Sequence, residues 1–300
     1  MYNPNDHKGA LEHRVDFVGY VEVRDSVANN GIDTEGPRVD AETGLGYIAE
    51  NFLKREFRNY IEATREGQPG YAINVIRGMP QLHPPKVALQ LLDFDLEDKK
   101  AAKNDPYLAY KVRDFMCKNF IDIRTFGGVM PNPKNDLNCG QISGPVSISG
   151  AWSVEPITTQ TLTISRSTVA SEEEVAKAKQ TMLGRKYIIP YALYRFTGSI
   201  SGCYAKKYTG FSEADMEVFF EALMNMFILG CSSSKTQVYT RKIFVFKHDS
   251  IYGNAKAHEL INAVEVKRVN ENAPARCFED YAITVNYDAI PEGVTLEVMD

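Results

Sequence analysis

Short runs of β-branched and aromatic residues recur along the chain and predict strands. The first run, residues 15–23, alternates in part between apolar and polar positions, as a strand with one buried face does. Similar runs predict strands near residues 120–130, 142–155 and 187–204, another at 243–246 and a final one at 281–287. Strands are thus predicted in both halves of the chain.

Apolar residues at helical spacing predict helices between those runs. Residues 46–65 carry an apolar arc that includes Phe57, which favours an amphipathic helix. Asp105-Pro106 opens a second predicted helix through about residue 119, because proline fits the first helical turn. A short helix is expected over residues 255–263.

Two capping-box pairs mark further helix starts. Ser171 with Glu174 predicts a short helix through residue 182, and Ser212 with Asp215 begins a longer, strongly apolar one. With the insertions set aside, the order is strand, helix, strands, helix, strand. That order is compatible with an α+β fold whose sheet is ferredoxin-like. Residues 67–103, rich in proline, and residues 158–186 are interpreted as long excursions from it.

The composition indicates a globular protein with a packed core, since 44% of the residues are hydrophobic and 24% are charged. Neither a membrane-length apolar run nor an apolar leader is found, so we expect a cytoplasmic protein without a membrane partner. The five cysteines stand far apart with no C-x-x-C pair. This dispersal fits a reducing compartment and predicts neither a metal site nor another cofactor.

Charge is distributed unevenly, although the net charge of −5 is unlike that of most nucleic-acid-binding proteins. Residues 175–212 contain no acid and seven cations, interleaved with aromatic residues. Cations neutralise phosphates and rings stack on bases, so this composition is typical of a surface for single-stranded nucleic acid. A strand-rich core segment whose lysines reach solvent would have the same composition. Composition alone leaves both interpretations open.

Further stretches are biased in the same way. Residues 222–248 also lack acids and carry four cations. Residues 137–154 are uncharged and hold glycines and small hydroxyl residues, which suit either a phosphate or a tightly turned, buried strand pair. Acids gather at residues 93–98 and, eight of them, from Glu265 to the C-terminus. Such acidic territories would suit surfaces that meet basic neighbours.

A basic stripe lies on the predicted helix over residues 46–65. Lys54, Arg58 and Arg65 align along one side of that helix, with Arg55 nearby. The stripe could bind phosphate or could be an ordinary solvated face, and the helix alone does not distinguish these.

Several longer strings resemble the backbone subunit of type I-C Cascade, the CRISPR-associated family numbered seven. They are GPRVDAETGLG (residues 36–46), LKREFRNY (53–60), FIDIRTFGGVM (120–130), NCGQISGPV (138–146), SVEPI (153–157), MLGRKYIIPYALY (182–194), TGFS (209–212) and GNAKAH (253–258). The similarity keeps this order over residues 12–300 and is specific to the family.

The resemblance implies an RNA-recognition-motif-like (ferredoxin-like) palm with finger insertions and a protruding thumb. The implied divisions are palm over 1–66, a finger-like insertion over 67–119, palm over 120–157, the thumb excursion over 158–186, and palm again over 187–300. Copies of such a subunit stack along one CRISPR guide RNA. Each thumb kinks the RNA, and the bases between the kinks stay free to pair with target DNA.

The resemblance also implies which residues meet RNA. In the first predicted helix, Lys54, Arg55 and Arg58 would face RNA phosphates, and Arg124, Gln141 and Ser143 would line the path of the RNA strand. Arg166, Met182, Arg185 and Lys186 would lie at the thumb and its base. In a late loop, Ser233, Ser234 and Lys235 would approach the RNA.

Two loops depart from the family pattern. Relatives carry an arginine in the late loop, where this chain has the serine run at residues 232–234. The loop over residues 26–33 lacks the usual Asn-Pro-Asn-Gly-Asp-Pro pattern. The implied partners are the guide RNA, target DNA through the guide, further copies of the chain, the end-capping Cas5-type subunit and the large subunit.

Three functions remain open at the level of sequence. The first is a guide-RNA-binding subunit that is not an enzyme, since no metal-ligand spacing or Ser/His/Asp motif is present. The second is an RNA-cleaving subunit of the type III kind, which would use a loop aspartate, Asp33 or Asp25. The third is a structural filament protein that assembles without nucleic acid.

Overall fold

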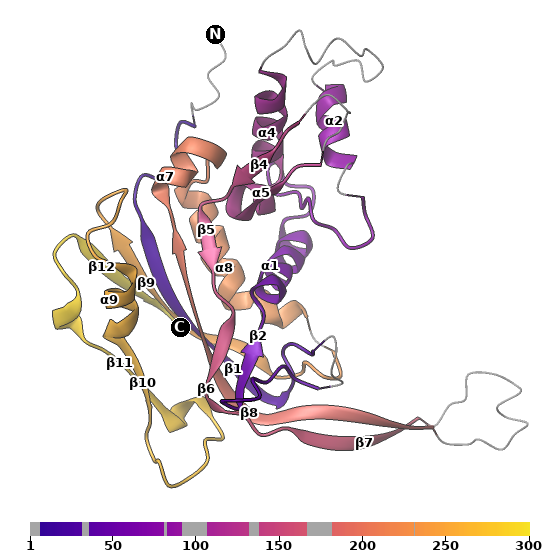
Figure 1. The fold of residues 1–300 in the computed structure, drawn as a ribbon, viewed down its shortest axis with the longest axis vertical. Helices are drawn as coiled ribbons and strands as arrows, with labels where there is room; N and C mark the ends of the chain where they lie inside the picture. The colour runs from indigo at the N-terminus through magenta and orange to yellow at the C-terminus, as the bar shows by residue number, and fades with distance from the viewer. Residues whose placement is uncertain are drawn as a thin grey trace, which may run out of the picture.

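The computed structural model of the protein describes residues 7–31, 36–80, 83–91, 107–131, 138–166, 182–230 and 232–300. Over these residues the chain forms a mixed α+β fold built on one large antiparallel sheet (Figure 1). This confirms the α+β class expected from the order of predicted strands and helices.

The large sheet has the strand order β12-β9-β1-β8-β6-β2, and β5 and β7 pair with β8 off this path. Each of these pairings is antiparallel. The strands are β1 (Val15–Ser26), β2 (Leu45–Ile48), β5 (Val146–Ile148), β6 (Ala151–Pro156), β7 (Gln160–Arg166), β8 (Met182–Ile200), β9 (Val238–His248) and β12 (Val294–Met299).

Four of these strands and two helices reproduce the ferredoxin-like arrangement. In chain order they are β1, α1 (Glu50–Arg65), β6, β8, α8 (Glu213–Leu229) and β9. In the sheet the strands lie as β9-β1-β8-β6, so each strand–helix–strand unit is split by a strand of the other. The ferredoxin-like palm expected from sequence is therefore present, with β2, β5, β7 and β12 as additions to it.

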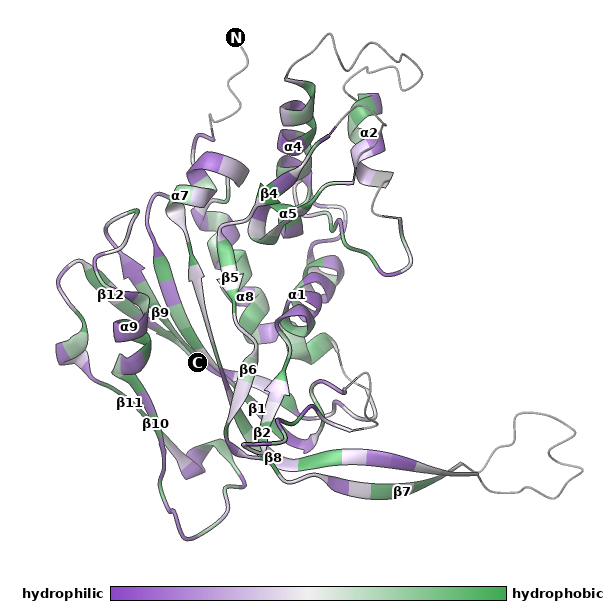
Figure 2. Cartoon of the chain, viewed as in Figure 1, coloured by the Kyte–Doolittle hydropathy of each residue, from purple (hydrophilic) through white to green (hydrophobic). Residues whose placement is uncertain are grey.

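Alternation along β1 gives the sheet a core on each face. Phe17 and Val21 belong to the core beneath α1 and α8, whereas Val18 and Tyr20 belong to the core on the opposite face. The helix-side core is aromatic at its centre, where Phe17 and Phe219 of α8 meet edge to face with centroids 5.8 Å apart. Figure 2 shows mostly hydrophobic residues along α8 and a mixed α1.

The opposite face is covered by the C-terminal part of the chain. Helix α9 (Ala257–Ala263) and the two-stranded sheet of β10 (Val264–Arg268) and β11 (Tyr281–Val285) pack there. Arg195 of β8 anchors this layer, because its guanidinium donates to the carbonyl oxygens of Ile261 at 2.6 Å and Val264 at 3.2 Å.

A two-stranded hairpin extends away from the body of the molecule (Figure 1). It consists of β7 and the first part of β8. Gln160 pairs with Ile188 at one end of the hairpin, and Arg166 pairs with Met182 at the other. Beyond the hairpin the same strand β8 enters the large sheet, where Ile189 pairs with Ser26. The hairpin is thus a continuation of a core strand.

A second unit with a core of its own lies beside the palm. It contains α2 (His83–Leu91), α4 (Leu108–Asn119), α5 (Ile121–Phe126), β3 (Gly127–Val129) and β4 (Gln141–Ser143). Its buried residues include Leu89, Val112, Met116 and Ile142. The remaining short helices are α7 (Gly202–Tyr204), the π-helix η1 (Ala205–Thr209), and the 3-10 helices η2 (Phe278–Asp280) and η3 (Tyr287–Ala289).

The strand predicted near residues 120–130 is wrong over Ile121–Phe126, which form α5. The segment alternates apolar and polar residues, a pattern that is typical of a strand with one exposed face. Asp122 and Arg124 are instead buried and paired inside the protein. The alternation therefore did not report exposure, and only Gly127–Val129 form a strand.

The predicted final strand is not the last one. Residues Tyr281–Val285 form β11, but β12 follows it at Val294–Met299 and makes the edge of the large sheet. The predicted helix over residues 46–65 begins later, at Glu50, because Leu45–Ile48 form β2. The helix predicted from Ser171 lies outside the described residues, except Met182, which begins β8.

Candidate nucleic-acid interface

Helix α1 brings two partly buried cations over an aromatic ring. The Lys54 ammonium lies 5.5 Å from the centroid of Phe126, and the Arg58 guanidinium lies 5.7 Å from it. Burial lowers the pKa of Lys54 from its ordinary value. Arg55, one residue further along the helix, is exposed. Phe126 was not among the predicted site residues, although its place before the Gly-Gly pair was visible in the sequence.

Arg58 is also part of an internal ion pair. Its Nε donates to Asp122 Oδ2 at 2.9 Å, and the Asp122 side chain is fully buried. The same carboxylate accepts the backbone N–H groups of Asn74 at 2.9 Å and Val75 at 3.1 Å. A buried carboxylate needs such partners, so Arg58 is committed in part to holding the chain after residue 73 against α5.

Arg124 is turned into the protein. It forms two hydrogen bonds with Asp215 and donates further to the carbonyl oxygens of Cys117 at 2.7 Å and Gly70 at 3.1 Å. The residue is buried. This geometry does not favour our expectation that Arg124 lines an RNA path, because its donors are already directed at protein groups.

Gln141 and Ser143 lie at the two ends of β4, where Gln141 is exposed and Ser143 half-buried. They pair with Val129 and Gly127 of β3. A Cβ at Gly144 would lie 2.2 Å from the backbone carbon of Phe126, and Gly127 has φ +68°. These glycines therefore serve a close backbone contact, which favours the buried strand-pair interpretation of the uncharged stretch at this place.

The hairpin carries Arg185, which is exposed, and Lys186, which is half-buried. Their register partners on β7 are Thr163 and Leu162. Arg166 and Met182 face each other in register at its outer end, and their side chains lie outside the described part of the structure.

The late loop is bound to α1 through Lys235. Its ammonium lies 3.2 Å from Glu56 Oε1 and 4.2 Å from the ring centroid of Phe52. The Glu56 side chain is buried, so the ion pair is shielded from water on one side. Ser233 is exposed, and Ser234 accepts a backbone hydrogen bond from Val27. This ties the loop to the end of β1.

In the described part of the acid-free window, residues 182–212, several aromatic rings lie in the core. Tyr191, Tyr194, Phe196 and Phe211 are buried, which favours the core-segment interpretation for these rings. At the surface of this window Tyr204 and Tyr208 stand at a right angle with centroids 5.4 Å apart, and Lys207 lies 5.1 Å from the Tyr208 ring. Lys177 and Lys179 lie outside the described residues.

The second acid-free window is neutralised in space by acids from elsewhere in the chain. Its four cations, each with its partner, are Lys235 with Glu56, Arg241 with Glu22 and Glu279, Lys242 with Asp300, and Lys247 with Glu297. Absence of nearby acids in the sequence therefore did not mean uncompensated charge.

Of the two candidate loop aspartates, Asp25 lies among the described residues. Asp25 is exposed, has φ +46°, and stands opposite Pro190 where the ladder between β1 and β8 is interrupted. Aspartate tolerates this conformation better than most residues, which fits a turn-forming role. Asp33 lies outside the described residues.

Among the described residues, no three His, Cys, Asp or Glu side chains are grouped so as to hold a metal ion. Nor, in the same part of the chain, does any helix combine the length and apolarity needed to cross a membrane.

The elements that carry the exposed cations share one side of the molecule. In Figure 1 the unit of α2, α4 and β4, then α1, and then the hairpin of β7 and β8 follow one another along that side. The exposed or half-exposed polar residues that these elements carry are Gln141, Ser143, Lys54, Arg55, Lys186 and Arg185. Cations and small polar groups on a surface can hold a phosphate backbone, because contacts to phosphates do not require contacts to base edges.

One of the comparisons with known proteins identifies a family. The family model described as CRISPR-associated protein Cas7 matches residues 13–286. A comparison with curated proteins finds no match. A chain of a structure entitled "CRISPR RNA-guided surveillance complex, pre-nicking" is 12% identical with a TM-score of 0.47, over 78% of each chain. A chain of another CRISPR RNA-guided surveillance complex is 12% identical with a TM-score of 0.44, over 78% of this chain and 68% of that one.

A third solved structure is of a type III complex. A chain of the Type III-B Cmr-beta bound to cognate target RNA is 14% identical with a TM-score of 0.40, over 78% of this chain and 61% of that one.

Proposed function

The chain belongs to the Cas7 family of CRISPR-associated proteins, and from this premise we propose that it is a repeating guide-RNA-binding subunit of a type I-C-like Cascade complex. The observation that carries the proposal is that α1, the helix with Lys54 and Arg55, lies on the same side of the molecule as the hairpin with Arg185 and Lys186. Guide RNA would follow that side. The bases between hairpins would pair with target DNA.

The chemistry of this side suits a guide whose sequence varies. A subunit that holds many guides must contact phosphate and sugar, and leave recognition of sequence to base pairing. Ammonium, guanidinium, amide and hydroxyl groups from Lys54, Arg55, Gln141 and Ser143 can make such contacts. We propose lesser, partly structural roles for Arg58 and Lys235, since each already pairs with a buried carboxylate.

We further propose a different role for each segment of the chain. Residues 67–119 would act as fingers, residues 158–186 as the thumb, and residues 1–66, 120–157 and 187–300 as the palm. Arg166 and Met182 would meet RNA from the thumb, and the serines of the late loop would approach it. Neighbouring partners would be further copies, an end-capping Cas5-type subunit and the large subunit.

The first test is binding of the purified protein to single-stranded RNA of two unrelated sequences, at several salt concentrations. Both should bind alike, and log K should fall with log salt by roughly 0.7 for each phosphate neutralised. Electron microscopy of protein co-expressed with a guide should show a short helical comb. A slope near zero, or combs from nuclease-treated material without RNA, would favour a nucleic-acid-free filament instead.

RNA cleavage is tested separately. We propose that the protein does not cut RNA, and that Asp25 is a turn residue, in line with its left-handed backbone. Incubation with Mg²⁺ and a target RNA paired to the guide should leave the RNA intact. Regularly spaced cuts that disappear in Asp33→Ala or Asp25→Ala would replace this proposal with the type III activity.

A further inference from the structure

A patch of two rings and a lysine lies on α7 and η1, outside the set of residues proposed to meet guide RNA. It consists of Tyr204, Lys207 and Tyr208, and all three residues are exposed. Tyr204 is 47% exposed and Tyr208 is 38% exposed, whereas Tyr194 in the preceding strand is buried. Core packing therefore does not account for these two rings.

The backbone beneath the patch is held by hydrogen bonds and by burial. The Gly210 N–H donates to the Ala205 carbonyl oxygen at 2.8 Å within the π-helical turn. The Cys117 thiol of α4 donates to the Tyr208 carbonyl oxygen at 3.8 Å. Ala205 and Thr209 are buried, so they fix η1 to the body of the protein. The rings thus stand on a firm support, and π-helical turns are frequent at functional sites.

The patch carries a positive charge that the described part of the chain leaves without an acid. Lys206 pairs with Glu12 at 2.8 Å, so these two charges cancel. No carboxylate of the described residues pairs with Lys207, whose ammonium lies 5.1 Å from the centroid of the Tyr208 ring. Beside it the Tyr204 ring stands at a right angle to that of Tyr208. Exposed rings next to an unpaired cation suit a ligand that is planar in one part and anionic in another.

The patch adjoins the side of the molecule that we propose for guide RNA. The turn η1 packs against β4, the strand that carries Gln141 and Ser143, and also against α4 and α5. Figure 1 shows α7 beside the unit that contains α4 and β4. A nucleic-acid strand that passes β4 would reach η1 next.

We propose that Tyr204, Lys207 and Tyr208 form a stacking site for one nucleotide of a single-stranded nucleic acid. The inference rests on the proposed function, and it adds a contact with a base to the contacts with phosphate and sugar. The base packs on a tyrosine ring, and Lys207 turns from the Tyr208 ring to the phosphate of the same nucleotide. Every base has a π-face, so such a site accepts a strand of any sequence.

Binding of the purified protein to two single strands of equal length tests the stacking. One strand is ordinary RNA, and the other has the same backbone without bases. Tyr204→Leu combined with Tyr208→Leu should weaken binding of the ordinary RNA by about fivefold to a hundredfold, the effect of losing one stacked base. Binding of the abasic strand should not change, because it offers no base to stack. An equal loss on both strands, or no loss on either, would overturn the proposal.

The matched control is Tyr287→Leu, which removes an exposed ring on η3. It should bind both strands as the wild type does. Lys207→Ala should reduce the salt slope of binding by roughly 0.7 on both strands, since it removes one cation from a phosphate. A slope that stays at the wild-type value in Lys207→Ala would exclude the phosphate contact.

Photo-crosslinking in the intact guide-containing complex tests the site without removing both rings. p-Benzoylphenylalanine at position 204 should crosslink to nucleic acid. A crosslink to the guide before target is added identifies guide RNA as the strand, and one that forms only after addition of target DNA identifies the target. Crosslinks to protein alone, or no crosslink, would overturn the proposal.

Failure of this inference is distinguishable from failure of the proposed function. A wild-type protein that binds RNA with the expected salt slope, while the double tyrosine variant loses no affinity, would remove the stacking site and leave the proposed function intact. A wild-type protein that binds neither strand would overturn both.

Discussion

Arg124 and Asp215 form a bidentate ion pair, with Nε–Oδ2 at 2.9 Å and Nη2–Oδ1 at 2.7 Å. Both side chains are almost fully buried. Asp215 also completes the capping box at the start of α8, where the Ser212 backbone N–H donates to it at 2.9 Å. The Asp215 carboxylate thus caps the start of α8 and pairs with Arg124 of α5. This ion pair connects the unit of α2, α4, α5, β3 and β4 to the palm.

Arg124→Ala should therefore destabilise the protein by about 3–5 kcal/mol, because it leaves a buried carboxylate without its charged partner. Urea unfolding followed by circular dichroism measures this. Arg124→Lys should recover only part of the loss, since an ammonium cannot make the two parallel hydrogen bonds. An Arg124→Ala variant with normal stability but a weaker salt dependence of RNA binding would instead make Arg124 an RNA contact.

Arg55 and Arg58 should behave differently although they lie on the same helix. Arg55→Ala should reduce the salt slope of RNA binding by roughly 0.7 without changing stability, because it removes an exposed cation. Arg58→Ala should also lower the free energy of unfolding, since Asp122 is fully buried. Fluorescence anisotropy at several salt concentrations and urea unfolding separate these effects. Lys267→Ala, an exposed lysine on β10, should change neither quantity.

The buried thiols should resist alkylation. Burial raises the pKa of Cys117 to about 12 and that of Cys139 to about 11, so neither forms a thiolate at ordinary pH. Iodoacetamide at about pH 8 should modify the half-buried Cys203 before either of them, because the thiolate is the reactive form. Mass spectrometry of native and guanidinium-unfolded samples shows the order. Equal rates in the native protein would contradict the burial of Cys117 and Cys139.

Glu155 should make stability depend on pH in the acid range. Burial opposes its ionisation, but hydrogen bonds from Arg268 and Tyr281 outweigh burial and lower the pKa of Glu155. The stabilisation is therefore complete above its ordinary pKa and is lost as pH falls through the lowered value. Glu155→Gln should show a smaller loss of stability than the wild type between about pH 5 and pH 3.

The control for this experiment is Glu271→Gln, which changes an exposed carboxylate. Its pH profile should coincide with that of the wild type. A Glu155→Gln profile that also coincides would mean that the contact between β6 and the C-terminal layer does not stabilise the fold.

Gly144→Ala should be among the most disruptive single-methyl changes. The added Cβ would lie 2.2 Å from the Phe126 carbonyl carbon and 2.3 Å from the Gly127 nitrogen, and backbone cannot rotate away as a side chain can. We expect a loss of at least about 3 kcal/mol. Gly67→Ala has nothing within 4 Å and should cost only the strain of its φ of +74°, about 1–2 kcal/mol. Thermal or urea unfolding compares the two, and similar losses would contradict the close contact at Gly144.

Elements whose signals are local were predictable from the sequence. The capping box of Ser212 and Asp215 begins α8 where it was expected, because its hydrogen bonds join residues three apart. Strand β1 likewise follows from its own residues. Helix α5 was not predictable in this way, since Asp122 and Arg124 find their partners on α1, α8 and the chain between α1 and α2.

In the candidate site, too, exposure of a residue depends on contacts that its neighbours in the sequence do not reveal. Arg55 and Arg185 are exposed, but Arg124 forms its ion pair inside the protein, and Lys235 is paired with a glutamate far away in sequence. The order of charges along a chain cannot report these pairs, because an ion pair depends on distance in space.

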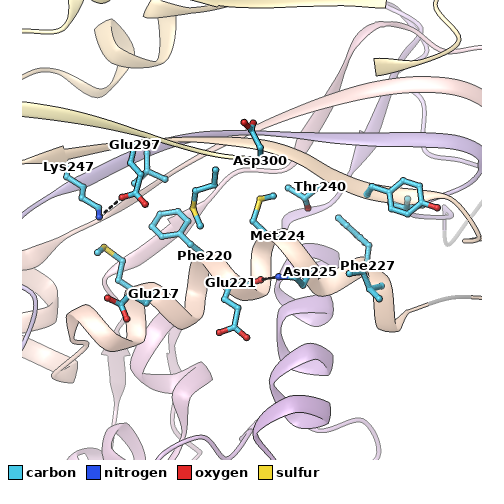
Figure 3. Close-up of a pocket in the computed structure, with 16 residues that line it drawn as sticks. Glu217, Phe220, Glu221, Met224, Asn225, Phe227, Thr240, Lys247, Glu297 and Asp300 are labelled. Atoms are coloured by element: carbon cyan, nitrogen blue, oxygen red, sulfur yellow. Dashed lines mark hydrogen bonds and ion pairs between the residues drawn. The ribbon is translucent and has the colours of Figure 1, made fainter. Parts of the chain in front are cut away.

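The α+β class, the start of α8 at its capping box and the surplus of cations in two long windows were predictable from the residues alone. Packing of distant segments sets which of those cations remain at the surface, and it neutralises the cations of residues 222–248 with acids from other elements. The same packing leaves a groove between α8 and the strands β9 and β12 (Figure 3). Propensity and capping act between near neighbours in the chain, whereas burial, ion pairing and grooves arise only when distant segments pack together.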